Sequence, residues 1–185
     1  MEDLQAFLRQ VRSRSVEHRR AMRALAKLGL PGQMVAILRQ ELDSLIRVIY
    51  LLTQDLDRRA QLVSASVGGK MWLKPNSRAR VTDREMVDLS QELQGWTQSV
   101  YKFGCAFIHL SAFHDYSDRD PLQQISPQER QDILEHSRAY HGGPKGESFA
   151  DLVPYLPKVL AKVSANLDCY LEELEANSVQ PADEV

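Results

Sequence analysis

Four of the five histidines of this chain lie between His109 and His141, which makes this stretch the richest in chemically reactive groups. His109 and His114 are five residues apart, and so are His136 and His141. Five positions turn roughly 140° around an ideal helix, so neither pair can chelate one metal ion on an unbroken helix. Asp115 could complete a mixed metal site, but histidines at helix ends commonly bind backbone carbonyl groups instead. We therefore expect no metal site and no cofactor.

A long core helix is expected to carry the first histidine pair. Its apolar residues recur at steps of three and four, which is the period of one helical stripe. They are Met86, Leu89, Leu93, Trp96, Val100, Phe103, Phe107 and Leu110, and the next step reaches His114. Thr82 and Glu85 have the spacing of a capping box at the start. The pattern predicts one continuous helix from Thr82 to Tyr116, with its last turn at the reactive segment.

Four further helices follow from the same periodicity, from the positions of Gly and Pro, and from a second capping box at Ser126 and Glu129. We expect them over residues 2–28, 31–64, 127–140 and about 157–174. Ser15 and His18 fall on the apolar stripe of the first helix, whereas Glu41 and Arg47 fall outside the stripe of the second. No segment has the alternating pattern of a strand. The sequence predicts an all-α, single-domain antiparallel bundle of about five helices over residues 1–177, followed by a disordered acidic tail, 178–185.

Composition limits the kinds of partner. The chain has 185 residues, 43% of them hydrophobic, and a formal charge of −2, which argues against a protein that binds polyanions over its whole surface. No run of about 20 apolar residues could span a bilayer, so we expect no membrane partner. Cys105 and Cys169 fall in apolar helical settings, so we expect buried free thiols in a reducing compartment. The predicted location is therefore the cytoplasm.

Positive charge is concentrated in two places despite the low net charge. Seven basic residues crowd the first helix: Arg9, Arg12, Arg14, Arg19, Arg20, Arg23 and Lys27. The loop expected after the second helix, up to Val81, combines cations with one large aromatic residue: Lys70, Trp72, Lys74, Arg78 and Arg80. Stacking on the indole and contacts with phosphates would suit single-stranded RNA, so these five are candidate nucleic-acid-binding residues. The alternative is a solvated loop with Trp72 folded back onto the bundle.

The segment from His109 to Tyr116 resembles the motif of HEPN-domain proteins, which include the HepT and abortive-infection types. These proteins carry an arginine, four to six residues and a histidine, often followed by x-Tyr, near the end of a long core helix. His114-Asp115-Tyr116 matches the end of that motif, and His109 stands where the family has arginine. The resemblance implies a homodimer that acts on RNA without a metal, in a prokaryotic defence or toxin–antitoxin system.

The resemblance also implies candidate catalytic residues, which are His114, His109 and Tyr116. A base must take the ribose 2′-hydroxyl proton, and a cation must stabilise the phosphorane-like charge. His109 would be cationic only part of the time and cannot form the bidentate fork of arginine. Either the two histidines act as an acid–base pair, or catalysis has been lost and the scaffold kept. His114 could also be a structural histidine at the edge of the core, hydrogen-bonded to a neighbouring helix.

A second class of function is a non-catalytic helical interaction module, which would bind a protein partner through the second helix or the acidic C-terminus. The second helix carries more apolar residues than one neighbouring helix can cover. Isologous pairing is the commonest way to bury such a surface. A homodimer is therefore expected under both classes of function.

Overall fold

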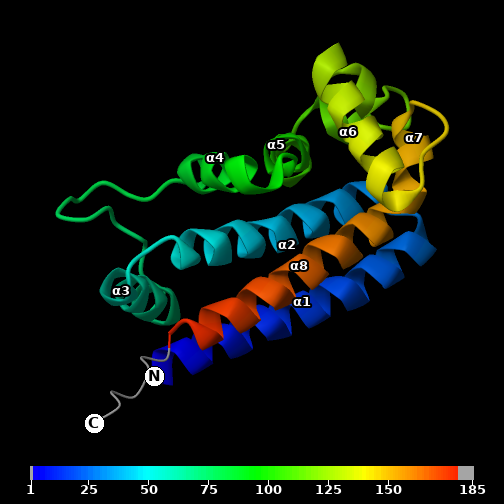
Figure 1. Ribbon diagram of the computed structural model, residues 1–185. Coiled ribbons are helices and arrows are strands. Elements are labelled where there is room, and N and C mark those ends of the chain that lie inside the picture. Colours follow the sequence, from blue (N-terminus) through cyan, green and yellow to red (C-terminus); the bar gives the residue numbers. More distant parts are fainter. Residues whose placement is uncertain (1, 179–185) are drawn as a thin grey trace, which may run out of the picture.

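The computed structural model describes residues 2–178 and shows an all-α protein (Figure 1). The helices are α1 (Glu2–Leu28), α2 (Pro31–Leu52), α3 (Leu56–Val67), α4 (Asp83–Gln94), α5 (Thr97–Ile108), α6 (Pro127–His141), α7 (Phe149–Leu152) and α8 (Leu156–Ala176). Three short 3-10 segments, η1 (Ala112–Asp115), η2 (Pro121–Gln123) and η3 (Val153–Tyr155), lie in the connections. The all-α prediction is confirmed. Within the described residues there are seven helices of 12 or more residues and the single turn α7, rather than about five helices.

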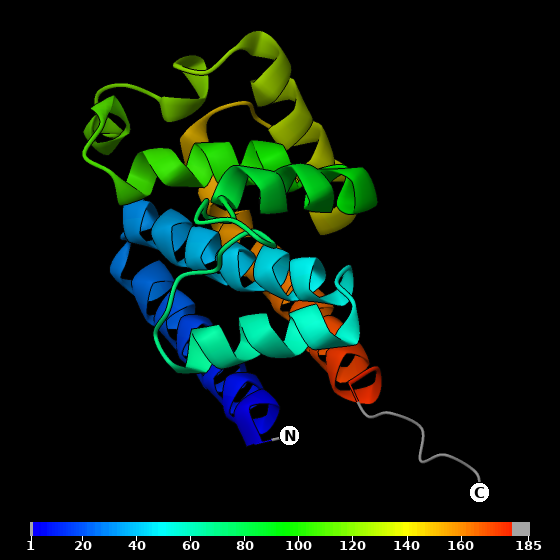
Figure 2. The same ribbon diagram turned by 90° about the vertical axis from the view of Figure 1, so that its left-hand side faces the viewer.

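Helix α2 occupies the centre of the bundle. Helices α1 and α8 pack on one side of it, and α4 and α5 pack on the other (Figures 1 and 2). A short turn at Gly29 makes α1 antiparallel to α2, whereas α2 and α8 run in the same direction. Helix α3 packs against α1 at the end where the described chain begins and ends. These intramolecular neighbours cover the apolar surface of α2, so this surface no longer supports the homodimer prediction.

The predicted helix over 31–64 is broken in two. Helix α2 ends at Leu52, and Asp55 starts α3 by accepting a hydrogen bond from the backbone N–H of Arg58 at 2.8 Å. The buried guanidinium of Arg59 donates to the carbonyls of Leu51 and Leu52 at 3.1 and 3.2 Å. It also donates to the carbonyl of Asn177 at 3.0 Å, just beyond α8. One cation therefore satisfies the carbonyl ends of two parallel helices, where the helix dipoles favour positive charge.

The predicted helix from Thr82 to Tyr116 is also wrong as one continuous element. Gly95 ends α4 in the left-handed region, with φ +73°, and Trp96 begins α5. Helix α5 ends at Ile108, because His109 is extended and the hydroxyl of Ser111 donates to the carbonyl of Ala106 at 2.6 Å. Glycine has no Cβ and adopts this left-handed conformation at little cost, which explains the break between α4 and α5.

The predicted stripe is buried only in part, as these breaks require. Met86, Phe103 and Phe107 are buried, and Leu89, Trp96 and Val100 are half-buried. Leu93 is 60% exposed and Leu110 is 96% exposed. Helix α5 nevertheless lies very close to α2, since a Cβ placed on Gly104 would be 2.7 Å from the Cβ of Arg39. The Arg39 guanidinium then lies 3.4 Å from the centre of the Tyr101 ring.

Other predicted features are confirmed. Helix α1 begins and ends as expected, and α6 is one residue longer than expected. Both capping boxes form, with Glu85 and Glu129 accepting from the backbone N–H groups of Thr82 and Ser126. Both cysteines are free thiols, but the prediction that they are buried is wrong, because Cys105 is half-buried and Cys169 is exposed. The predicted tail at 178–185 lies outside the described residues except for Ser178.

A buried carboxylate joins the three longest helices, which is where the sequence prediction for Glu41 is wrong. Glu41 of α2 is 0% exposed, and it accepts hydrogen bonds from Ser15 of α1 and from Ser164 of α8, the latter at 2.6 Å. Its second oxygen lies 2.7 Å from Nδ1 of His18, also on α1. The stripe rule places Glu41 at the surface because that rule reads one helix at a time. The partners of Glu41 lie on two other helices.

Hydrogen bonding keeps this carboxylate ionised. Burial raises the pKa of Glu41, but the hydrogen bonds from His18, Ser15 and Ser164 outweigh it, so the pKa lies below the ordinary value of 4.5. An isolated carboxylate would not remain charged at a position without solvent. We call Glu41, Ser15, His18 and Ser164 the polar core.

Replacing Glu41 with Gln should lower the free energy of unfolding at pH 7 by about 1–3 kcal/mol, because an amide cannot accept all the hydrogen bonds that the carboxylate accepts and a buried partner is left unsatisfied. A group whose folded pKa is lowered stabilises the fold above its unfolded pKa, and this stabilisation is lost as the pH falls through the folded pKa. Wild-type stability should therefore decline below about pH 4.5, and Glu41→Gln should show less of this decline. Urea denaturation across pH measures both effects. Glu17→Gln, at an exposed position of α1, is the matched control. If Glu41→Gln lowers the free energy of unfolding by less than about 1 kcal/mol, the account is contradicted.

Candidate functional site

The structure places His109 and His114 in an exposed turn rather than on a helix. His109 follows the last residue of α5 with an extended backbone, and His114 lies in η1. Both side chains are exposed. Nδ1 of His114 lies 3.3 Å from the backbone carbonyl of Ser111, and its ring centre is 6.0 Å from that of Phe107. The described contacts of His114 therefore lie within its own turn and with Phe107 of α5, and its side chain is exposed rather than hydrogen-bonded to a neighbouring helix.

Tyr116 differs from the two histidines because it is part of the packing. Its ring centre is 6.4 Å from that of Phe107 and 6.0 Å from that of Phe149. A Cβ placed on Gly32, at the start of α2, would lie 3.1 Å from a ring carbon of Tyr116. This side chain closes the end of the bundle near the start of α2. Its ring is half-buried, so the described contacts account for it as a packing residue.

Trp72 is folded back onto the bundle, which is the alternative that the sequence left open. The side chain is 5% exposed, and its ring stacks on Tyr50 of α2 with the centres 5.8 Å apart. Nε1 donates to the hydroxyl of Ser66 at 2.8 Å. A nucleobase could not stack on this indole without displacing Tyr50. The loop after α3 is therefore pinned to the bundle by its one large aromatic side chain.

The cations of this loop fall into two groups. Lys74 pairs with Glu85, and this contact, with the hydrogen bonds from Thr82, lowers the pKa of Glu85 to about 2. Lys70, Arg78 and Arg80 are exposed and take part in no ion pair that the structure describes over residues 2–178. An antiparallel bridge between Leu73 and Arg80 narrows the loop, and Asn76 at its tip has φ +53°. Three of the four predicted cations thus remain free at the surface.

The cations of α1 divide in the same way. Arg12 pairs with Glu175 at 2.8 Å and Arg19 with Asp168 at 3.2 Å, both on α8. Arg14 lies 3.8 Å from Asp43 of α2. The acidic C-terminal helix therefore neutralises the side of α1 that faces it. The two pairs with α8 join residues 163 and 149 positions apart, so the sequence alone could not separate paired from unpaired cations.

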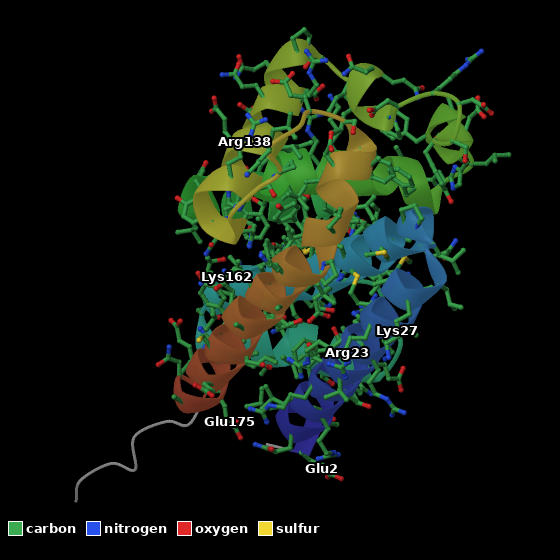
Figure 3. All side chains as sticks on the ribbon, turned by 90° about the vertical axis from the view of Figure 1, so that its right-hand side faces the viewer. Glu2, Arg23, Lys27, Arg138, Lys162 and Glu175 are labelled. Carbon is green, nitrogen blue, oxygen red and sulfur yellow. The ribbon has the colours of Figure 1, made fainter. Side chains whose placement is uncertain are left out.

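The remaining cations of α1 point away from the bundle. Arg9, Arg20, Arg23 and Lys27 are exposed, and none has an ion pair among the described residues. At 100° per residue they fall within roughly 60° of one another, and they span about 27 Å along the axis. Figure 3 shows two of them on the half of α1 that leads into α2. We call these four residues the basic stripe.

Acidic residues near the basic stripe are few. Glu2 lies at the start of the same face, and Glu17 lies to one side of it. Both are exposed. The outward face of α1 therefore carries an excess of positive charge, on a chain whose formal net charge is −2. The sequence showed the crowding of cations, and a helical wheel drawn from the buried positions Ser15 and His18 could have found the stripe.

The described residues do not form two other kinds of site. Between residues 2 and 178, no group of three or more His, Cys, Asp or Glu side chains could hold a metal ion. Among the helices that the structure describes, none is both long and apolar enough to cross a membrane.

Comparisons with known proteins do not assign a family. No family model, curated protein or solved structure matches this chain.

Proposed function

We propose that this protein binds RNA through the basic stripe of α1, as a HEPN-like helical protein of a defence or toxin–antitoxin system. The observation that supports this proposal is the row of four exposed cations without carboxylate partners in the described chain. Arginine and lysine side chains bind phosphate groups, and such contacts supply most of the affinity in binding that does not depend on base sequence. The choice of RNA over other polyanions rests on the resemblance of residues 109–116 to the HEPN motif.

The polar core supports the proposal by orienting α1. Ser15 and His18 are held inward by Glu41, so the opposite side of the helix must face solvent. The exposed Lys70, Arg78 and Arg80 of the loop after α3 add a second group of possible phosphate contacts. Trp72 does not enter the proposal, because it is buried against Tyr50.

Replacing all four residues of the basic stripe with Gln should weaken binding of a labelled single-stranded RNA at low salt. It should also reduce the slope of log affinity against log salt by up to about 3, since each phosphate contact with a single strand contributes about 0.7. Fluorescence anisotropy across a salt series measures both quantities. A second variant, with Gln at Lys70, Arg78 and Arg80, should reduce the slope by up to about 2 if the loop contributes.

The matched control is Arg12→Gln with Arg19→Gln. It removes two cations from the same helix, but these cations are already paired with α8. We expect its salt slope to stay close to that of the wild type. The proposal is wrong if the wild type shows no binding at low salt, or if the stripe variant and the control change the slope equally per charge removed.

RNA cleavage by His109 and His114 is a separate prediction. Both imidazoles are exposed, and no basic side chain is described in contact with either, so we expect the wild type to bind RNA without cutting it. His109→Arg would restore a permanent bidentate cation. Product analysis should detect a 2′,3′-cyclic phosphate only if the pair is catalytic. Wild-type cleavage with a bell-shaped pH dependence, abolished by His114→Ala, would contradict our expectation.

Binding of a protein partner, including a second copy of this chain, is the second candidate function. It is favoured by the turn after α5, where Ile108 is 44% exposed and Leu110 is 96% exposed. Sedimentation velocity at tens of micromolar should show a dimer if this turn pairs two chains, and Leu110→Asp should then give a monomer. A wild-type monomer, or a dimer that Leu110→Asp leaves intact, would remove the turn from consideration as a dimer contact.

A further inference from the structure

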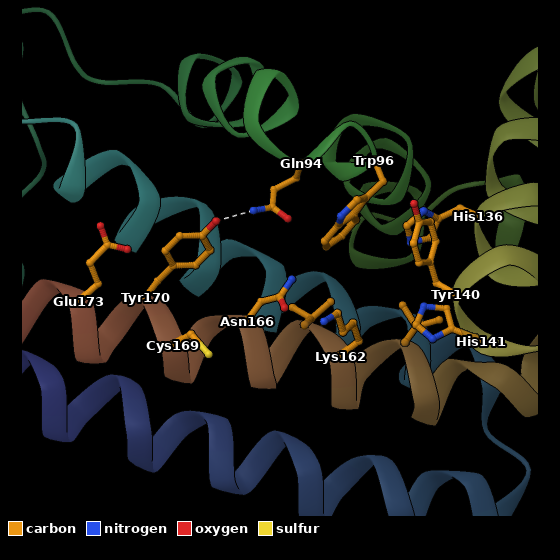
Figure 4. Close-up of a pocket in the computed structure, with 12 residues that line it drawn as sticks. Gln94, Trp96, His136, Tyr140, His141, Lys162, Asn166, Cys169, Tyr170 and Glu173 are labelled. Atoms are coloured by element: carbon orange, nitrogen blue, oxygen red, sulfur yellow. Dashed lines mark hydrogen bonds between the residues drawn. The ribbon is translucent and has the colours of Figure 1, made fainter.

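A pocket of about 510 Å³ lies between the start of α5, the end of α6 and the middle of α8 (Figure 4). We call it the α6–α8 pocket. Its volume lies within the range of roughly 300–1,000 Å³ that is typical of small-molecule sites. The residues that line it come from parts of the chain that do not form the basic stripe, so it is independent of the proposed function.

One end of the pocket is an aromatic wall. The ring of His136 lies 5.5 Å from that of Trp96 and 4.6 Å from that of Tyr140, centre to centre. Tyr140 is 71% exposed, and Trp96 and His136 are each half-buried. Side chains this large and this open to solvent offer stacking surface to a planar ligand. Nothing in the described packing covers the outer side of Tyr140.

A cation lies beside this wall. Figure 4 shows Lys162 of α8 between Trp96 and His141. No carboxylate lies within ion-pair distance of Lys162 among the described residues. Glu173 is the acidic residue among the residues that line the pocket. It lies 11 positions after Lys162 on α8, which places it about 16 Å away along the helix axis. The ammonium group therefore remains free to bind an anion.

The other polar groups near the wall are uncharged around neutral pH. Burial lowers the pKa of His136, and the neighbouring His141 lowers it further. Burial lowers the pKa of His141 as well, with added repulsion from Lys158 and Lys162. Each neutral imidazole offers one donor and one acceptor. Asn166 contributes an amide to the same lining. The part of the pocket beside the wall thus combines one positive charge, neutral hydrogen-bonding groups and exposed rings, with Glu173 at the other end.

We propose that the α6–α8 pocket binds one nucleotide, with the base stacked on the aromatic wall and the phosphate at the Lys162 ammonium. A planar base matches the exposed rings of Trp96 and Tyr140. A phosphate supplies the anion that Lys162 lacks within the protein. The nucleotide can be a free mononucleotide or one unit of an RNA strand, because the same chemistry recognises both.

Titration of the whole protein with the four ribonucleoside 5′-monophosphates should change the fluorescence of Trp96 in a saturable way. Trp72, the other tryptophan, is buried in the loop after α3 and should not respond. Trp96→Phe should remove the signal, which identifies its source. The nucleosides without phosphate, and inorganic phosphate without a base, should each bind at least about tenfold more weakly, since each makes only part of the contacts.

Lys162→Gln should weaken nucleotide binding at least about tenfold and leave the weak binding of nucleosides unchanged, because only the phosphate contact is lost. Lys145→Gln is the matched control, since Lys145 is an exposed lysine between α6 and α7 that does not line the pocket. Tyr140→Ala should weaken nucleotides and nucleosides alike. This pattern of losses separates the phosphate contact from the stacking contact.

The source of the nucleotide is settled by comparing the mononucleotides with a short oligoribonucleotide. Binding of either one that is lost in Lys162→Gln supports the pocket, and the tighter binder identifies the source. Absence of a Lys162-dependent signal with both probes overturns the proposal. The basic-stripe variant should bind mononucleotides normally, because its four residues do not line the pocket. A wild-type protein that binds mononucleotides but not RNA would refute the proposed function and leave the pocket standing.

Discussion

The ionised carboxylate of Glu41 is the constraint on which the rest of the structure depends. It is inaccessible to solvent and lies where α1, α2 and α8 meet, with Ser15, His18 and Ser164 as its partners. A buried charge is tolerable only where its hydrogen bonds are made, so the three helices must approach with these residues in register. Sliding or rotating α1 by one residue would leave Glu41 without its partners from α1.

This register decides which charges face outward. With Ser15 and His18 turned inward, Arg12 and Arg19 lie beside α8 and pair with its carboxylates. Arg9, Arg20, Arg23 and Lys27 lie further around the helix toward solvent, and no ion pair is described for them. A chain with slightly negative net charge can therefore present one strongly basic face, because few of its acidic residues lie on that face of α1. The proposed binding of RNA follows from this division of charge.

Sequence periodicity predicted the fold class and the helix boundaries that depend on local chemistry. Proline at the first turn and the capping boxes at Thr82 and Ser126 are signals within four residues, and they form as expected. The two long helices predicted over residues 31–64 and 82–116 are each broken by features that the apolar periodicity does not detect. Gly95 takes a left-handed backbone, and Arg59 reaches the carbonyl ends of both α2 and α8. A stripe of apolar residues can continue across such a break.

The candidate site was less predictable, because its properties depend on contacts across the chain. The loop cations were visible in the sequence, but the stacking of Trp72 on Tyr50 was only one of two alternatives. Glu41 was placed at the surface because its partners lie 23 to 123 positions away. The α6–α8 pocket joins Trp96, His136 and Lys162 from three helices. In the sequence its two histidines showed only as a pair with the wrong spacing for a metal.

The central claim is that RNA contacts the exposed cations of α1 that have no described ion pair, and leaves Arg12 and Arg19 in their ion pairs with α8. The most direct test is an NMR titration that follows the arginine Nε–H signals as RNA is added at low salt. The account predicts that the signals of Arg9, Arg20 and Arg23 shift, while those of Arg12 and Arg19 stay in place. Shifts at Arg12 and Arg19 without shifts at the outward three, or no shift at any arginine of α1, would contradict it.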